Sequence, residues 1–200
     1  MSIVVFDFDK TITTKDTFNM FMYFCGKQDK FYSIKILMYS IFIVLRKLRL
    51  IGNLKQKQVA LRIFLPRENI ILNNYAKEFI KNIPLNHKIV ALLNKKQKEH
   101  NIIICSASLS NYIKLLLPGF KVIGMEYNCT TQEITQHPYK REKLTYLKKA
   151  GINKIDELYT DSYSDKYLAM IARKIFVVER GNIHKYNDYD SFRKHFRKYS

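Results

Sequence analysis

Short apolar runs alternate with amphipathic stretches through the second half of the chain, and this alternation restricts the possible folds more than any other feature. Strands are predicted at residues 102 to 108, 121 to 127, 156 to 162 and 174 to 179. Helices are predicted before and between them, in HKIVALLNKKQKEHN, NYIKLLL, KREKLTYLKKAG and DKYLAMIA. Strands that alternate with helices of this length form a parallel sheet with helices on both faces.

The first half of the chain has a different period. Residues 3 to 8 form a short β-branched and aromatic run that predicts a buried strand. From Asp16 to about Leu93 the apolar residues recur at helical spacing. We therefore predict an α/β protein with a Rossmann-like, doubly wound parallel sheet and an all-helical insertion after its first strand. The expected core domain comprises residues 1–15 and 90–200, and the helical domain comprises residues 16–89.

Two acids stand only two positions apart where the first strand ends, in IVVFDFDKTIT (residues 3 to 13). Unpaired carboxylates are costly inside a core, so Asp7 and Asp9 predict a functional site. If the strand continued, their side chains would point to opposite faces. The backbone is therefore expected to leave strand geometry near Phe8.

Other predicted strands also end in polar residues. Ser106-Ala107-Ser108 closes the second strand, and the fourth runs out through Asp161 to Asp165. Ligand sites form at the carboxyl ends of such strands, so four carboxylates are expected to converge there. Ser106 as an ordinary turn residue, and Asp161 and Asp165 as helix-capping acids, remain alternatives.

A cation is required if four carboxylates are to stay ionised together. The ligand set contains only oxygen, which suits Mg²⁺. A lysine at the start of the helix before Asp161 is expected to reach the same edge and to meet an anionic substrate. Lys140 is the preferred candidate, and Lys143, one turn further into the helix, is the alternative.

The four elements DFDKTIT, SAS, a lysine that leads a helix, and TDSYSD resemble, in order and spacing, the motifs of the haloacid dehalogenase superfamily. The helical insertion is similar to the cap of its phosphoserine-phosphatase branch. A weaker resemblance, to the phosphatidylglycerophosphatase type, rests on the hydrophobic segment of the cap and on Arg180-Gly181 after the last strand. Two positions depart from the common pattern, which has glycine where this chain has Lys10 and Thr160.

The resemblance implies a phosphatase that works through an aspartyl phosphate on Asp7, with Asp9 as general acid and base. It implies that phosphate is bound by Thr11, Ser106, Ala107 and Lys140. It also implies a Mg²⁺ site formed by the Asp7 and Asp161 carboxylates and the Asp9 carbonyl, with Asp165 in the outer shell. Phosphoryl transfer depends mostly on positioning and charge stabilisation, and these groups provide both.

Charge and cysteine content limit the partners and the compartment. The chain has 35 Lys and Arg against 17 Asp and Glu, a net charge of +18, which attracts phosphates, nucleic acid or an anionic membrane. Lysines that merely cover exposed helix faces are the plainer interpretation. Three cysteines without metal spacing favour a reducing compartment, and no signal peptide is recognised. We expect a cytoplasmic protein.

Residues 36 to 45, ILMYSIFIVL, are uncharged but too short to span a membrane by themselves. They form either a buried helix or a helix that lies on a membrane, with basic ends towards lipid head groups. The resemblance to the phosphatidylglycerophosphatase type implies a membrane-associated substrate, a lipid or isoprenoid-linked phosphate, and the protein would then bind peripherally at the inner face of the membrane. A soluble metabolite such as phosphoserine is the alternative. A basic nucleic-acid-binding module that retains the fold is a more remote one.

Overall fold

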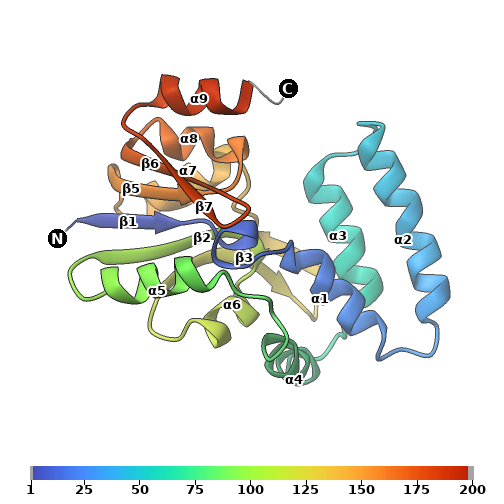
Figure 1. The fold of residues 1–200 in the computed structure, drawn as a ribbon. Helices are drawn as coiled ribbons and strands as arrows, with labels where there is room; N and C mark the ends of the chain where they lie inside the picture. Colours follow the sequence, from blue (N-terminus) through green and yellow to red (C-terminus); the bar gives the residue numbers. More distant parts are fainter. Residues whose placement is uncertain (1, 198–200) are drawn as a thin grey trace.

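The computed structural model describes residues 2–197, and its centre is a seven-stranded sheet in the order β4-β3-β2-β1-β5-β6-β7 (Figure 1). Strands β1, β2, β3, β5 and β6 are parallel, and β4 and β7 are antiparallel edges. The bounds are β1 Ile3–Phe6, β2 Asn101–Leu109, β3 Lys121–Asn128, β4 Glu133–Gln136, β5 Ile155–Thr160, β6 Ala172–Glu179 and β7 Asn182–Tyr186. The predicted doubly wound parallel sheet is confirmed, but the two edge strands were not predicted.

Strand β1 lies at the centre because its side chains are apolar on both faces. It pairs with β2 on one side and with β5 on the other. Val4 and Phe6 belong to one hydrophobic core and Val5 to another, and all three are fully buried. Such continuous apolar runs are typical of parallel strands covered on both faces.

Helices cover the two faces of the sheet. Helices α5 (His87–Lys96) and α6 (Ser110–Leu116) contribute to the core that contains Val4 and Phe6. Helices α7 (Arg141–Lys149), α8 (Lys166–Ala169) and α9 (Tyr189–Arg197) contribute to the core around Val5. Residues 198–200, the end of the basic tail, lie outside the described residues.

Four helices follow the first strand and its turn. They are α1 (Thr17–Gly26), α2 (Tyr32–Lys47), α3 (Asn53–Phe64) and α4 (Asn69–Ile80). Figure 1 shows α2 and α3 as an antiparallel pair at the side of the molecule, with α1 between them and the sheet. We call α1–α4 the cap. The predicted domain boundary at residues 89 and 90 falls inside α5 and stays a prediction.

Helix α2 is not buried, contrary to one of the two expectations for residues 36 to 45. Tyr39 is its one buried residue, at 1% exposure. No helix among the described residues is long and apolar enough to cross a membrane.

Candidate active site

The site begins where β1 ends. Strand β1 ends at Phe6, Asp7 keeps an extended backbone, and an irregular turn follows at Phe8–Ile12, where the backbone is expected to leave strand geometry. Lys10 has a φ of 56° in this turn, a left-handed conformation that favours glycine. The turn separates Asp7 from Asp9 and allows both carboxyl groups to serve one edge of the sheet.

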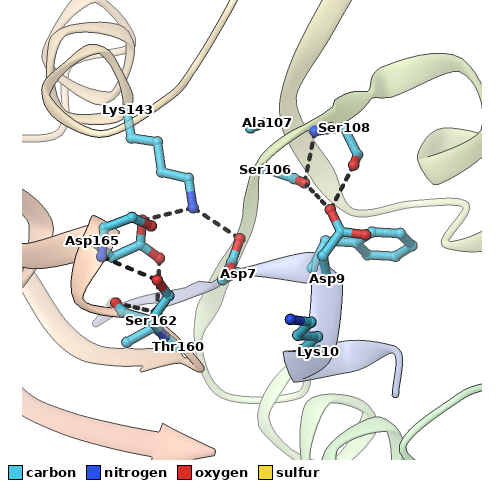
Figure 2. Close-up of polar contacts among 12 residues, drawn as sticks. Asp7, Asp9, Lys10, Ser106, Ala107, Ser108, Lys143, Thr160, Ser162 and Asp165 are labelled. Atoms are coloured by element: carbon cyan, nitrogen blue, oxygen red, sulfur yellow. Dashed lines mark hydrogen bonds and ion pairs between the residues drawn. The ribbon is translucent and has the colours of Figure 1, made fainter. Parts of the chain in front are cut away.

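Asp7 is held by both backbone and side-chain contacts. Its amide donates to the Tyr159 carbonyl at 2.8 Å, which fixes the residue to β5. The Lys143 ammonium lies 2.8 Å from Asp7 Oδ1 and 2.8 Å from Asp165 Oδ1. Figure 2 shows the Lys143 side chain reaching between the two carboxylates. A buried cation thus bridges two buried anions.

The electrostatics of this group follow from its burial. Burial disfavours the ammonium, but the Asp165 and Asp7 carboxylates outweigh it and raise the pKa of Lys143. Lys143 therefore stays charged. Burial also raises the pKa of Asp7; Lys143 opposes this increase, and the Asp165 carboxylate adds to it.

The prediction that Lys140 is the lysine that reaches the site was wrong, because Lys143 occupies that place. Lys140 precedes α7, is exposed, and places its ammonium 5.3 Å from the Tyr139 ring centroid. Lys143 and Leu147 are the two buried residues of α7. Because residues four apart share a helix face, the lysine in register with Leu147 points to the core. That i, i+4 register was visible in the sequence.

Asp9 accepts hydrogen bonds on both carboxylate oxygens. Oδ1 accepts from the Thr17 amide at 2.7 Å and from the Thr17 hydroxyl at 2.6 Å. Oδ2 accepts from the Ser108 hydroxyl, and Ser106 Oγ lies 3.5 Å away (Figure 2). Thr17 begins α1, so Asp9 connects the site to the cap. The sequence did not single out Thr17, and it marked Ser108 only as part of a polar strand end.

The predicted phosphate-binding residues differ in their burial and in their hydrogen-bond contacts. Ser106 is fully buried, and its hydroxyl oxygen accepts from the Ser108 amide at 3.0 Å. The Thr11 hydroxyl is buried and has no hydrogen-bond partner among the described residues. The Ala107 carbonyl faces the cap and accepts from Lys57 Nζ at 2.6 Å. Lys140 does not join this group.

Asp161 directly follows β5, and Asp165 ends the short helical turn Tyr163–Asp165 after it. Asp165 is fully buried and accepts a hydrogen bond from the Thr160 hydroxyl at 2.8 Å. Thr160, which stands where the common family pattern has glycine, therefore has a structural role. Burial and the Asp165 carboxylate raise the pKa of Asp161 to about 6. Asp7, Asp161 and Asp165 thus repel one another, and a bound cation would relieve the repulsion.

The carboxylates of the site suit Mg²⁺ better than they suit a metal ion that needs side-chain ligands alone. No group of three or more Asp, Glu, His or Cys side chains in residues 2–197 is arranged to hold a metal alone. A cation here would therefore also need backbone carbonyl, water or substrate oxygens. Mg²⁺ is usually bound in this way, through one or two carboxylates, waters and phosphate.

A cavity of about 190 Å³ opens above these groups, between the sheet edge and the cap. Asp7, Asp9 and Asp161 line its floor, and Asn53 and Lys57 of α3 line the opposite wall. The Lys57 ammonium lies 4.3 Å from the Phe18 ring centroid, and its withdrawal from water lowers the pKa of Lys57 to about 8. The sequence did not predict a role for Lys57.

Comparisons with known proteins give a match to one family and to several solved structures. The model of the haloacid dehalogenase-like hydrolase family matches residues 4–170. A protein of unknown function from Bordetella pertussis Tohama I has a TM-score of 0.70 at 14% identity, with 82% of this chain and 83% of that chain covered. A comparison with curated proteins gives no match.

Two further structures are described as phosphoserine phosphatases or similar to them. A phosphoserine phosphohydrolase-like protein from Francisella tularensis has a TM-score of 0.60 at 20% identity, covering 88% of this chain and 86% of that chain. A phospho-aspartyl intermediate analogue of phosphoserine phosphatase has a TM-score of 0.52 at 14% identity, covering 97% and 98%. At these identities the likeness establishes a shared fold.

Proposed function

Because this chain belongs to the haloacid dehalogenase-like hydrolases, we propose that it is a magnesium-dependent phosphomonoester hydrolase that forms an aspartyl phosphate on Asp7. The observation that carries the proposal is the buried Asp7 carboxylate, held by Lys143 beside Asp161 and Asp165 at the floor of a cavity. A structural ion pair has no need of an open cavity or of two additional acids.

The reaction has two steps. An oxygen of the Asp7 carboxylate attacks phosphorus, and the bond between phosphorus and the ester oxygen breaks as Asp9 gives its proton to that oxygen. Asp9 then accepts a proton from a water molecule that attacks the phosphoenzyme, which releases inorganic phosphate and restores Asp7. The contacts from Thr17 and Ser108 to Asp9 support this role because they fix the position of the acid.

The remaining residues stabilise charge. Lys143 offsets the negative charge of the nucleophile and the phosphoryl group, while Thr11, Ser106 and the Ala107 amide hold phosphoryl oxygens. The carboxylates of Asp7 and Asp161 and the carbonyl of Asp9 would hold Mg²⁺, and Asp165 would support its outer shell. When bound, Mg²⁺ neutralises charge on the transferring group. Fixed charges of this kind are the main source of catalysis in phosphoryl transfer.

The proposed substrate is a membrane-associated phosphate, lipid or isoprenoid-linked, and the protein would act in the cytoplasm at the inner face of a membrane. The exposed apolar residues of α2 and the basic residues near its ends support this choice. A soluble metabolite is the second candidate. It is favoured by Asp16 and Lys57, which line the same cavity with opposite charges and suit a small zwitterion.

A phosphate-release screen tests the proposal. A generic aryl phosphate, phosphoserine, and lipid phosphomonoesters in detergent are each assayed with Mg²⁺ and with a chelator. We expect Mg²⁺-dependent release by the wild type and loss of release in Asp7→Asn. The matched control Asp190→Asn changes an exposed aspartate of α9 and is expected to retain activity. Activity in Asp7→Asn equal to that of the wild type would exclude this nucleophile.

A further inference from the structure

Helix α2 carries an apolar face that no described residue covers. Its members stand three or four positions apart along the helix and just beyond it, and we call them the α2 stripe. Their exposures are Ile34 58%, Leu37 68%, Met38 49%, Ile41 56%, Val44 53% and Leu48 63%. Exposed apolar residues are ordinary when scattered, but a contiguous face of this kind marks an interaction site.

The opposite face of α2 explains how the stripe is held outward. Tyr39 is buried against Phe64 of α3, with their ring centroids 5.5 Å apart, and its hydroxyl contacts Asn19 and Gln56. Ile36 and Ile43 pack on the same side. Figure 1 shows α2 as the helix furthest from the sheet, with α3 beside it on the side toward the sheet. Because this opposite face packs on α3, the stripe faces away from the rest of the protein.

The residues around the stripe are mostly basic, which favours an anionic partner. Between Lys27 and Arg62 there are nine basic residues and one acid, Asp29. The Lys35 ammonium lies 2.6 Å from Asp29 and neutralises it. Basic residues stand at both ends of α2: Lys27 and Lys30 precede it, Lys47 is its last residue and Arg49 follows it, and all four are exposed. A second copy seated on the stripe would oppose these charges with charges of the same sign.

We propose that the α2 stripe is a docking surface that enters the interfacial region of an anionic lipid bilayer. A helix of 16 residues is about 24 Å long and would lie in the membrane plane, with its apolar side chains among the acyl chains and its basic ends at the head groups. An anionic bilayer would thus contact both the apolar face of α2 and the basic residues at its ends.

The role of this surface rests on the proposed function, because docking would bring the active site to a lipid substrate. Helix α3 packs against α2, and its residues Asn53 and Lys57 line the cavity above Asp7. Packed helices lie about 8 to 10 Å apart, so a docked α2 would hold the cavity close to the head groups. A phosphate carried by a lipid would then reach the site without leaving the bilayer surface.

The chain contains no tryptophan, so a single introduced Trp reports on insertion. Leu37→Trp places the probe on the stripe, and Ile70→Trp places a control on α4, where Ile70 is 76% exposed. Vesicles of phosphatidylcholine alone and with phosphatidylglycerol are added at low salt. We expect a blue shift in emission for Leu37→Trp with the anionic vesicles only, and none for Ile70→Trp. An equal response of the two probes would overturn the proposal.

Vesicle flotation with unlabelled variants tests the contributions of the apolar and basic residues. The double variant Leu37→Ser, Ile41→Ser is expected to lower the partition coefficient roughly tenfold or more, while Ile70→Ser leaves it unchanged. The double variant Lys47→Glu, Arg49→Glu is expected to lose binding to anionic vesicles, unlike Lys95→Glu on α5. A wild type that ignores anionic vesicles, or that forms a dimer which the serine variant abolishes without lipid binding, would refute membrane docking.

Hydrolysis of a soluble aryl phosphate separates this inference from the proposed function. The stripe variants are expected to hydrolyse it at the wild-type rate, because the stripe lies outside the cavity. Activity without vesicle binding would refute docking alone. Vesicle binding without activity in the wild type would refute the phosphatase and leave docking intact.

Discussion

Lys143 has a different task from the other lysines of this strongly basic chain. Its ammonium is buried and lies 2.8 Å from each of two buried carboxylates. Removing one partner from such a group leaves uncompensated charge, which costs about 3 to 5 kcal/mol. Lys143 is therefore expected to support both the fold and the reaction, whereas Lys140 supports neither.

Replacement of each lysine by methionine separates the two. We expect Lys143→Met to lower kcat roughly 100-fold or more and to lower the melting temperature, because Asp7 and Asp165 lose their shared cation. Lys140→Met should change both quantities little, since Lys140 is exposed. Steady-state kinetics on an aryl phosphate and thermal melts give the two readouts. A larger kinetic effect from Lys140→Met would reverse the assignment.

Helix α3 connects the cap to the core. Gln58 donates to the Gln132 carbonyl and accepts from the Ile134 amide at 3.0 Å. Arg62 donates to the same Gln132 carbonyl at 3.1 Å. These contacts fasten α3 to the turn between β3 and β4 and to β4 itself, and they set the position of Lys57 over the cavity.

Loss of the Gln58 contacts is expected to loosen the cap. Gln58→Ala should raise KM several-fold with a smaller change in kcat, and should speed hydrogen exchange at the Ile134 amide. Gln56→Ala is the matched control, because Gln56 bonds to Tyr39 inside the cap. If both variants change KM equally, the attachment of α3 to this turn does not position the cap.

The elements also show what sequence reasoning could and could not predict. Strongly apolar strands such as β1 and β2 were predicted because burial on both faces leaves an uninterrupted signal. The edge strands β4 and β7 were missed, since they are mostly exposed and carry polar residues. The acids Asp7, Asp9, Asp161 and Asp165 were found from their place after strands. Thr17 and Lys57 were not, because their contacts depend on how the cap is oriented.

The excess of basic residues gives the molecule a net charge of +18. A field of this sign draws dianionic substrates towards the protein, and salt screens it. We expect kcat/KM for an aryl phosphate to fall several-fold between low and physiological ionic strength, with kcat nearly constant. Initial rates at fixed free Mg²⁺ measure this. A salt-independent kcat/KM would show that the excess charge does not act on the substrate.

Asp7 is expected to become phosphorylated during turnover. The most direct measurement is an acid quench during hydrolysis, followed by borohydride reduction and peptide mass spectrometry. An aspartyl phosphate is reduced to homoserine, so we expect homoserine at position 7 in the wild type with substrate and Mg²⁺, and none without substrate. Modification at another residue, or turnover with Asp7 unmodified throughout, would contradict the assignment of Asp7 as the nucleophile.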